Sequence, residues 1–149
     1  GGDIAFVGTV LFLIMLGSTI AMLVIGKMAD RYGKKQTLTV TMALSSLFLF
    51  AGRASGGWTA ILFFVLGTAA VNATMPITAA IAQEMVPNSR GMASSIVMGL
   101  SWGMGNMLMA PFGKVGDLFG VDAILLIVAF LPLATLPLLL TRPFREAKS

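Results

Sequence analysis

The sequence predicts an all-α membrane protein with five transmembrane helices. It is 57% hydrophobic and only 11% charged, whereas a soluble domain carries about 25% charged residues. The charges divide the chain into five charge-free runs of 23, 17, 30, 23 and 19 residues, close to the roughly 20 helical residues that cross a bilayer. The runs lack the strict alternation of a membrane-spanning β-barrel. The expected helices cover about residues 4–26, 36–52, 58–85, 91–113 and 122–141.

The composition also excludes several classes of function. The chain contains no Cys and no His, so it has no thiol nucleophile and no imidazole base or ligand. No charge-free run holds paired carboxylates or a nucleophile beside a base. We therefore expect no catalytic residue, no metal, no cofactor and no enzymatic activity. The isoelectric point is near 10.0, but the bases gather at the ends of apolar runs instead of along one face, which argues against a nucleic-acid partner.

The first two expected helices are typical packing elements. In the first, Gly17 and Ala21 lie one turn apart, and small residues at that spacing let another helix approach closely. The second carries hydroxyl side chains, which can bond back to the carbonyl four residues earlier and so enter the membrane at little cost. We expect the following hydroxyls to pack and not to bind a ligand: Thr37, Thr39, Thr41, Ser45 and Ser46.

The third expected helix is the most irregular. Pro76 removes a backbone donor and predicts a kink. Asn72 carries an amide that needs a partner at membrane depth, either a neighbouring helix or a water-filled cavity, and the residues leave both open. With the period of 3.6, one face of this helix carries Thr68, Asn72, Met75, Ala79 and Gln83.

The fourth and fifth expected helices each carry one unusual feature. Trp102 lies in mid-span, although tryptophan prefers the membrane interface. Its N–H needs a partner, and either Asn106 one turn later or a stacked ligand can supply one. The fifth helix contains Pro132 and Pro137, which should bend it, and opens at Asp122, where a carboxylate suits the helix dipole. The polar face of the fourth helix carries Ser95, Gly99, Trp102, Asn106 and Met109.

The orientation follows from the dense charge cluster Gly26–Lys35. If this segment lies in the cytoplasm and the helices alternate, the inner segments hold eight bases and the outer segments two. That asymmetry obeys the positive-inside rule, and it predicts a multi-pass protein of the plasma (inner) membrane with its first residue outside and its last residue inside. The inner bases are Lys27, Arg31, Lys34, Lys35, Arg90, Arg142, Arg145 and Lys148, and the outer ones are Arg53 and Lys114.

The same cluster, read as G-K-M-A-D-R-Y-G-K-K, resembles the signature loop of the major facilitator superfamily of transporters, G-x-x-x-D-R-x-G-R/K-R/K. Both glycines, the acid, the arginine and the paired bases stand at the matching positions. The resemblance implies that Asp30 holds the inner helix ends in one closed state. Its partner would be Arg31, Arg90 or a helix N-terminus elsewhere in the transporter. The implied signature residues are Gly26, Asp30, Arg31, Gly33 and Lys34.

Two further stretches narrow the resemblance. Residues 83–95 look like the cytoplasmic turn before the fifth or eleventh helix of that superfamily. The run Gly99–Gly105, with Pro111-Phe-Gly and Asp117-Leu-Phe-Gly120 after it, is similar to drug exporters of the fosmidomycin-resistance group. The resemblance then makes residues 1–149 the last five of twelve helices, an incomplete six-helix C-terminal half; the competing register is the second to sixth helices of the N-terminal half. The chain begins with Gly instead of Met, and we expect a fragment or a processed product.

Two classes of function remain open at this stage. The first is transport of a small molecule, as implied by the resemblance: proton-coupled drug or metabolite efflux by alternating access against the missing N-terminal helices. The second is a membrane scaffold or partner subunit without a transport cycle. Transport predicts polar groups that face a cavity, with a substrate site at Asn72, Met75, Trp102 and Asn106. A scaffold predicts that Asn72 and Asn106 bond only to neighbouring helices.

Overall fold

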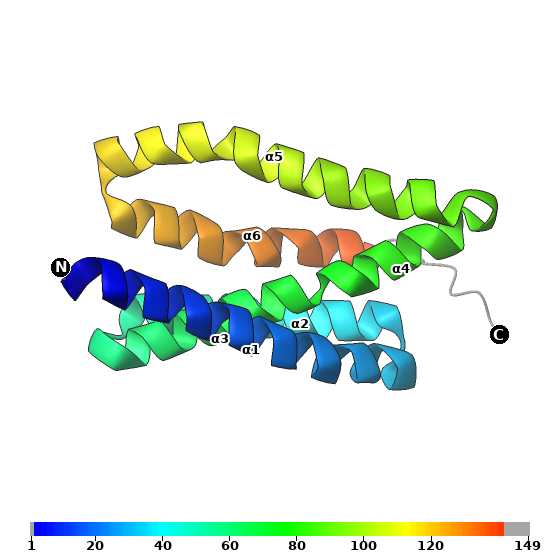
Figure 1. Cartoon of the computed structure of the whole chain (residues 1–149), viewed down its shortest axis with the longest axis horizontal. Coiled ribbons are helices and arrows are strands. Elements are labelled where there is room, and N and C mark those ends of the chain that lie inside the picture. The colour runs from blue at the N-terminus through cyan, green and yellow to red at the C-terminus, as the bar shows by residue number, and fades with distance from the viewer. Residues whose placement is uncertain (1, 142–149) are drawn as a thin grey trace.

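The computed structural model describes residues 2–141, and its architecture is a bundle of helices joined by short turns (Figure 1). Within this range there is no β-strand, so the predicted all-α fold is confirmed. Each helix satisfies its own backbone groups, as a chain in lipid requires. The helices are α1 (Gly2–Tyr32), α2 (Lys34–Ala54), α3 (Gly57–Ala73), α4 (Met75–Met85), α5 (Arg90–Phe119) and α6 (Val121–Thr141), with a 3₁₀ turn η1 (Pro87–Ser89) before α5.

Four segments are long and apolar enough to cross a membrane: Ile4–Tyr32, Lys34–Ala54, Gly57–Met85 and Val121–Thr141. They correspond to four of the five expected spans. The fifth, α5, is 30 residues long, but glycines, serines and Asn106 keep it below the hydropathy of the other four. A helix of this composition suits a surface covered by protein or water better than one covered by lipid tails.

The third span is broken between α3 and α4. The break lies at Thr74, two residues before Pro76. Pro76 has no N–H to donate to the carbonyl of Asn72, and the Thr74 hydroxyl donates to the Val71 carbonyl at 2.7 Å, which closes the last turn of α3. The predicted irregularity at Pro76 is therefore confirmed as an interruption that a proline and a threonine produce together.

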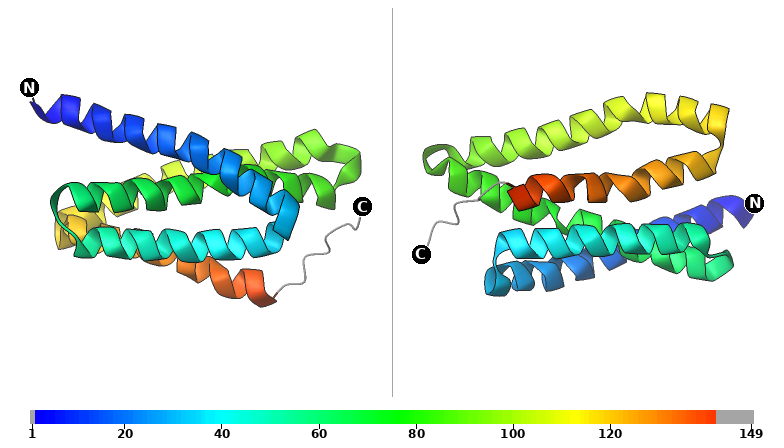
Figure 2. Two further views of the ribbon diagram at one scale, coloured as in Figure 1. Left: turned by 90° about the horizontal axis from the view of Figure 1, so that it is seen from below. Right: turned by 180° about the vertical axis from the view of Figure 1, so that it is seen from behind.

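Apart from the break at Thr74, the turns between helices lie at the two ends of the bundle (Figures 1 and 2). The turn at Gly33 and the turn from Val86 to Ser89 share one end, and the turns at Ser55–Gly56 and Gly120 share the other. Lys34 and Arg90 follow the first pair of turns, whereas Arg53 and Lys114 belong to the other end. This separation matches the charge asymmetry of the sequence. The bases Arg142, Arg145 and Lys148, which the orientation argument also counted, lie outside the described residues.

The centre of the bundle is α2, which packs against both α3 and α6 through two buried serines. The Ser45 hydroxyl donates to the Gly67 carbonyl of α3 at 3.1 Å, and the Ser46 hydroxyl donates to the Ala129 carbonyl of α6 at 2.7 Å. Ala129 lies three residues before Pro132, where the proline opens the helix and tilts carbonyls outward. The predicted packing role of these hydroxyls is confirmed, although both serines bond across helices and not within α2.

Candidate functional site

The signature segment is mostly helical. We predicted a loop over Gly26–Lys35, but α1 continues through Gly26 to Tyr32 and α2 begins at Lys34. Only Gly33 lies between them, with φ 92° and ψ 146°, a backbone conformation that side chains other than glycine rarely adopt. The glycine at position 33 is thus required by the sharp reversal, whereas Gly26 is an ordinary helical residue with open space beside it.

Asp30 is the one acidic side chain of this segment, and it is solvent-exposed in the last turn of α1. Within residues 2–141 its carboxylate makes no ion pair, and the expected pairing with Arg31 or Arg90 is not formed. Lys34, one turn later in sequence, pairs instead with Glu84 near the end of α4. The carboxylate of Asp30 is therefore available to a group outside the described helices.

A pocket of about 210 Å³ adjoins Asp30. Apolar side chains of α1 and α4 form its floor, and Asp30 and Lys34 contribute the charged groups. Two of its lining residues, Ala29 and Ile77, also form a small buried cluster with Leu38 of α2. The pocket thus combines a rigid apolar base with one carboxylate that is not engaged by a cation. Its lining comprises Met22, Gly26, Ala29, Asp30, Lys34, Pro76, Ile77 and Ala80.

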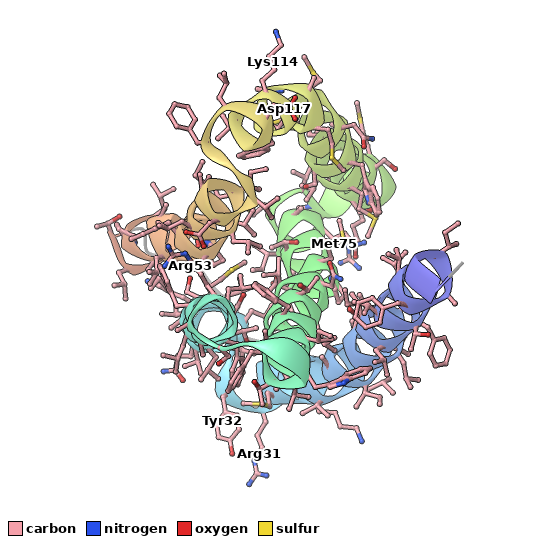
Figure 3. The ribbon with its side chains drawn as sticks, turned by 90° about the vertical axis from the view of Figure 1, so that its left-hand side faces the viewer. Arg31, Tyr32, Arg53, Met75, Lys114 and Asp117 are labelled. Atoms are coloured by element: carbon pink, nitrogen blue, oxygen red, sulfur yellow. The ribbon has the colours of Figure 1, made fainter. Side chains whose placement is uncertain are left out.

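The predicted cavity residue Asn72 lies within a helix contact. Its side-chain nitrogen donates to the Ser18 hydroxyl of α1 at 3.0 Å, and Ser18 itself is only 5% exposed. Met75, one turn along the same segment, is half-buried, and Figure 3 places it on the side of α4 toward α1 and α5. Of the two environments left open for Asn72, the structure shows the interhelical bond.

Trp102 and Asn106 have a different environment. Both lie on α5, which has no buried residue along its length, and Trp102 is 65% exposed. Of the two partners left open for the Trp102 N–H, Asn106 is not bonded to it, and Asn106 makes no side-chain hydrogen bond to any residue that the structure describes. The structure therefore separates Asn72, which is bonded within a helix contact, from Trp102 and Asn106, which are exposed on α5.

The Asn72–Ser18 and Lys34–Glu84 contacts each include one residue, Ser18 or Glu84, that was absent from the predicted sites. Ser18 is 54 positions from Asn72, and only the run of small residues in α1 pointed to a close contact there. Glu84 is 50 positions from Lys34, and its position at a helix–turn boundary was its one signal. Among the described residues no group of three or more His, Cys, Asp or Glu side chains is placed to hold a metal ion.

Comparison with known proteins decides the family. The family model described as Major Facilitator Superfamily matches residues 1–149. The chain belongs to the major facilitator superfamily. Members of this superfamily are transporters and not enzymes, and they lie in a lipid bilayer. Membership of this family therefore explains both the signature segment and the apolar spans.

Two curated relatives of the superfamily are similar to the chain. One is the fosmidomycin resistance protein of Escherichia coli (strain K12), 30% identical over 124 residues, which are 83% of this chain and 29% of the relative. The other is the uncharacterized MFS-type transporter YfnC of Bacillus subtilis (strain 168), 30% identical over 127 residues, which are 82% of this chain and 30% of the relative. The chain thus spans less than a third of the length of either relative. No solved structure matches it.

The Asn72–Ser18 bond makes the first testable prediction. Asn72→Ala and Ser18→Ala should each lower the thermal unfolding midpoint in detergent, because each removes one partner of the same bond. Such bonds within membranes contribute about 0.6 kcal/mol on average and at most about 1.7. The double variant should lose little more than either single variant, since the second change finds the bond already broken. Additive losses would show that the two side chains act independently.

Proposed function

We propose that this chain is part of the C-terminal half of a twelve-helix transporter that moves a small molecule, a drug or a metabolite, out of the cell by proton-coupled alternating access. The observation that carries the proposal is α5, a helix with Trp102 and Asn106 exposed and no residue buried. An indole N–H and an amide at membrane depth need protein or water beside them. A substrate cavity shared with the rest of the transporter supplies both.

The alternative of a scaffold without a transport cycle receives support from Asn72, whose amide bonds to the neighbouring α1. A scaffold also requires such a bond at Asn106, and the described helices offer none. The two amides thus have different roles. Asn72 stabilises the packing of α3 against α1, and Asn106 lines the substrate cavity together with Trp102 and Met75. This division favours transport.

The helices that carry the polar groups decide which helices of a twelve-helix transporter this chain corresponds to. In the C-terminal register α3 and α4 correspond to the tenth helix, α5 to the eleventh, and α2 and α6 to the ninth and twelfth. In this register α2 and α6 are the two outer helices, and they pack against each other, with α6 on the side of the bundle away from α1 (Figure 3). The N-terminal register, as helices two to six, remains the alternative.

The coupling proton needs a titratable group, and the spans described here provide few. Glu84 lies in the last turn of α4, within the third apolar segment, and it is paired with Lys34 at one end of the bundle. We therefore assign proton coupling to acids in the remaining helices of the transporter, with Glu84 as the candidate within this chain. Exchange of substrate against a pH gradient in vesicles tests this, with Glu84→Gln as the variant.

The orientation is tested with single cysteines, because the chain contains no native Cys. Gly56→Cys and Asn88→Cys place thiols at exposed positions in turns at opposite ends of the bundle. We expect an impermeant thiol reagent added to intact cells to label position 56 and not position 88, because the bases near Asn88 favour the cytoplasm. The reverse labelling pattern would invert the proposed topology.

The substrate role of Trp102 is tested in the complete reading frame that contains this chain. Fosmidomycin is the first compound to examine, since a relative is named for resistance to it. Expression in a susceptible bacterium should raise the inhibitory concentration, and Trp102→Ala should remove several-fold of that gain. Loss of one aromatic stacking contact costs about 0.5–1.5 kcal/mol beyond the area it buries, which corresponds to this range.

Leu100→Ala is the matched control. Leu100 lies two residues before Trp102 on another face of α5 and is similarly exposed, so it should leave resistance unchanged at equal expression. Equal losses at both positions would show that α5 tolerates no truncation, and the cavity assignment of Trp102 would fail.

A further inference from the structure

The helices α2 and α6 are joined in one antiparallel register. At the end of the bundle that carries the Gly120 turn, the Arg53 guanidinium pairs with the Asp122 carboxylate, with 2.5 Å between Nη2 and Oδ2. Two turns away, seven residues before Arg53 and seven after Asp122, the buried Ser46 hydroxyl donates to the Ala129 carbonyl at 2.7 Å. Residues seven apart share one face of a helix, so both contacts belong to the same interface.

The end of α5 is joined to α6 at the same end of the bundle. A Cβ atom at Gly116 would lie 2.5 Å from Cδ1 of Ile124, so the two helices are in close contact there. The Gly120 N–H donates to the Gly116 carbonyl at 2.9 Å, and Gly120 reverses the chain with φ 82°. The last turn of α5 and the first turn of α6, which contains Asp122, therefore form one compact hairpin.

Arg53 connects this hairpin to α2. It lies in the last turn of α2, beside α6 in the view along the bundle (Figure 3), and its partner Asp122 follows Gly120 by two residues. The base is at the C-terminal end of its helix and the acid at the N-terminal end of its own, which are the ends that the helix dipoles favour. The pair is therefore not needed to offset a misplaced charge, and what it adds is a link between the two helix ends.

We propose that Arg53 is a positioning residue for transport, which acts through Asp122 to fix the end of α5 against α2. α5 is one continuous helix from Arg90 to Phe119, so a displacement of its end is passed on to its middle. Trp102 and Asn106 lie in that middle part. The inference rests on the proposed function, because these two residues are its cavity residues.

Loss of the pair should move the hairpin without unfolding the bundle. The side chains of Arg53 and Asp122 are 35% and 67% exposed, and an exposed pair contributes at most about 1 kcal/mol, which is about fivefold in an equilibrium constant. Ser46 and Ala129 are buried, and their bond keeps α2 and α6 together. We therefore expect a change of up to about fivefold in the population of the aligned hairpin.

The test measures the position of α5 and transport separately, in the complete reading frame that contains this chain. Gly56→Cys and Leu118→Cys, both at exposed positions, carry spin labels whose separation is measured by double electron–electron resonance, with any cysteine outside residues 1–149 replaced by serine. We expect Arg53→Gln and Asp122→Asn each to add a second separation to the distance distribution.

In the same variants, the fosmidomycin concentration for half-maximal transport should rise about two- to fivefold, with the maximal rate retained at equal surface expression. The double variant should resemble either single variant, since the second change finds the pair already broken. If the wild type does not transport fosmidomycin, the proposed function fails for that compound, and the distance distribution alone decides whether Arg53 fixes α5.

Two control variants separate the pair from other effects of charge. Arg53→Lys keeps the cation and should retain most of the wild-type behaviour. Lys114→Gln removes a base that points away from the bundle (Figure 3) and forms no ion pair within residues 2–141, so it should change neither measurement. An unchanged distance distribution in both Arg53→Gln and Asp122→Asn, or a changed distribution with unchanged half-maximal transport, would overturn the positioning role. A thermal unfolding midpoint that falls in step with transport would also overturn it, because the pair would then be a purely structural contact.

Discussion

Replacing Gly67 by valine is expected to prevent stable packing of α2 against α3. A Cβ atom at position 67 would lie 2.8 Å from Cγ and 2.9 Å from Cδ2 of Leu49, distances that atoms in folded proteins essentially never show. Leu49 cannot turn away, because it is only 4% exposed. Overpacking of this kind costs about 1–3 kcal/mol, and separation of the helices would also remove the bond from Ser45 to the Gly67 carbonyl.

The measurement is the thermal unfolding midpoint and the monodispersity of the purified chain in detergent. Gly8→Val is the matched control, since nothing lies within 4 Å of its Cβ position. Leu49→Ala combined with Gly67→Val should recover part of the loss, because it removes the atoms that collide. If Gly67→Val behaves like Gly8→Val, the close approach of α2 and α3 at this position is wrong.

The location of the helices was predictable because charge is costly in lipid. Four of the five charge-free runs correspond to segments that can cross a membrane, and the remaining run became α5. The same rule placed the helix ends too early, since charged side chains can extend from the last turns of a helix into the interface. For this reason α1 continues six residues beyond Gly26, and α5 continues past Gly113 to Phe119.

The contacts between helices were not predictable in the same way. Periodicity identified the residues that share a face with Asn72, but it contains no information about which helix covers that face. The partner, Ser18, depends on the tertiary arrangement of α1 and α3. Likewise, the motif identified Lys34 and Asp30 as functional candidates, and only the arrangement of α2 and α4 shows that Lys34 pairs with Glu84 and that Asp30 forms no ion pair within residues 2–141.

The sequence also did not indicate which glycines lie in turns and which lie in helices. The sequence contains 17 glycines, and among those the structure describes only Gly33, Gly57 and Gly120 adopt positive φ. Each of the three lies at a turn between helices, where the chain must reverse within one or two residues. Gly56 also lies in a turn, with an extended backbone, whereas the remaining described glycines are helical.

Asp30→Asn is expected to reduce transport by the complete protein at least tenfold while leaving membrane insertion intact. A carboxylate in the last turn of α1 faces the negative end of the helix dipole, which is unfavourable by about 0.3–1 kcal/mol. Within residues 2–141 no cation forms an ion pair with this carboxylate, and Lys34 is paired with Glu84. The carboxylate is therefore placed to accept from a positive group outside this chain, and the pocket beside it has space for that group.

A hydrogen bond to a charged group is worth about 1.5–3 kcal/mol, so its loss shifts the population of the closed state tenfold or more. Asparagine keeps the size of the side chain and removes the charge, and transport assays with surface-expression controls separate function from insertion. Asp117→Asn is the matched control: Gly113, Asp117 and Gly120 repeat the spacing of Gly26, Asp30 and Gly33, and the last turn of α5, which carries Asp117, lies at the opposite end of the bundle from the last turn of α1 (Figure 1). Transport by the Asp117→Asn variant should stay within twofold of wild type. If the Asp30→Asn variant transports like wild type, the signature segment serves only to anchor the helices in the membrane.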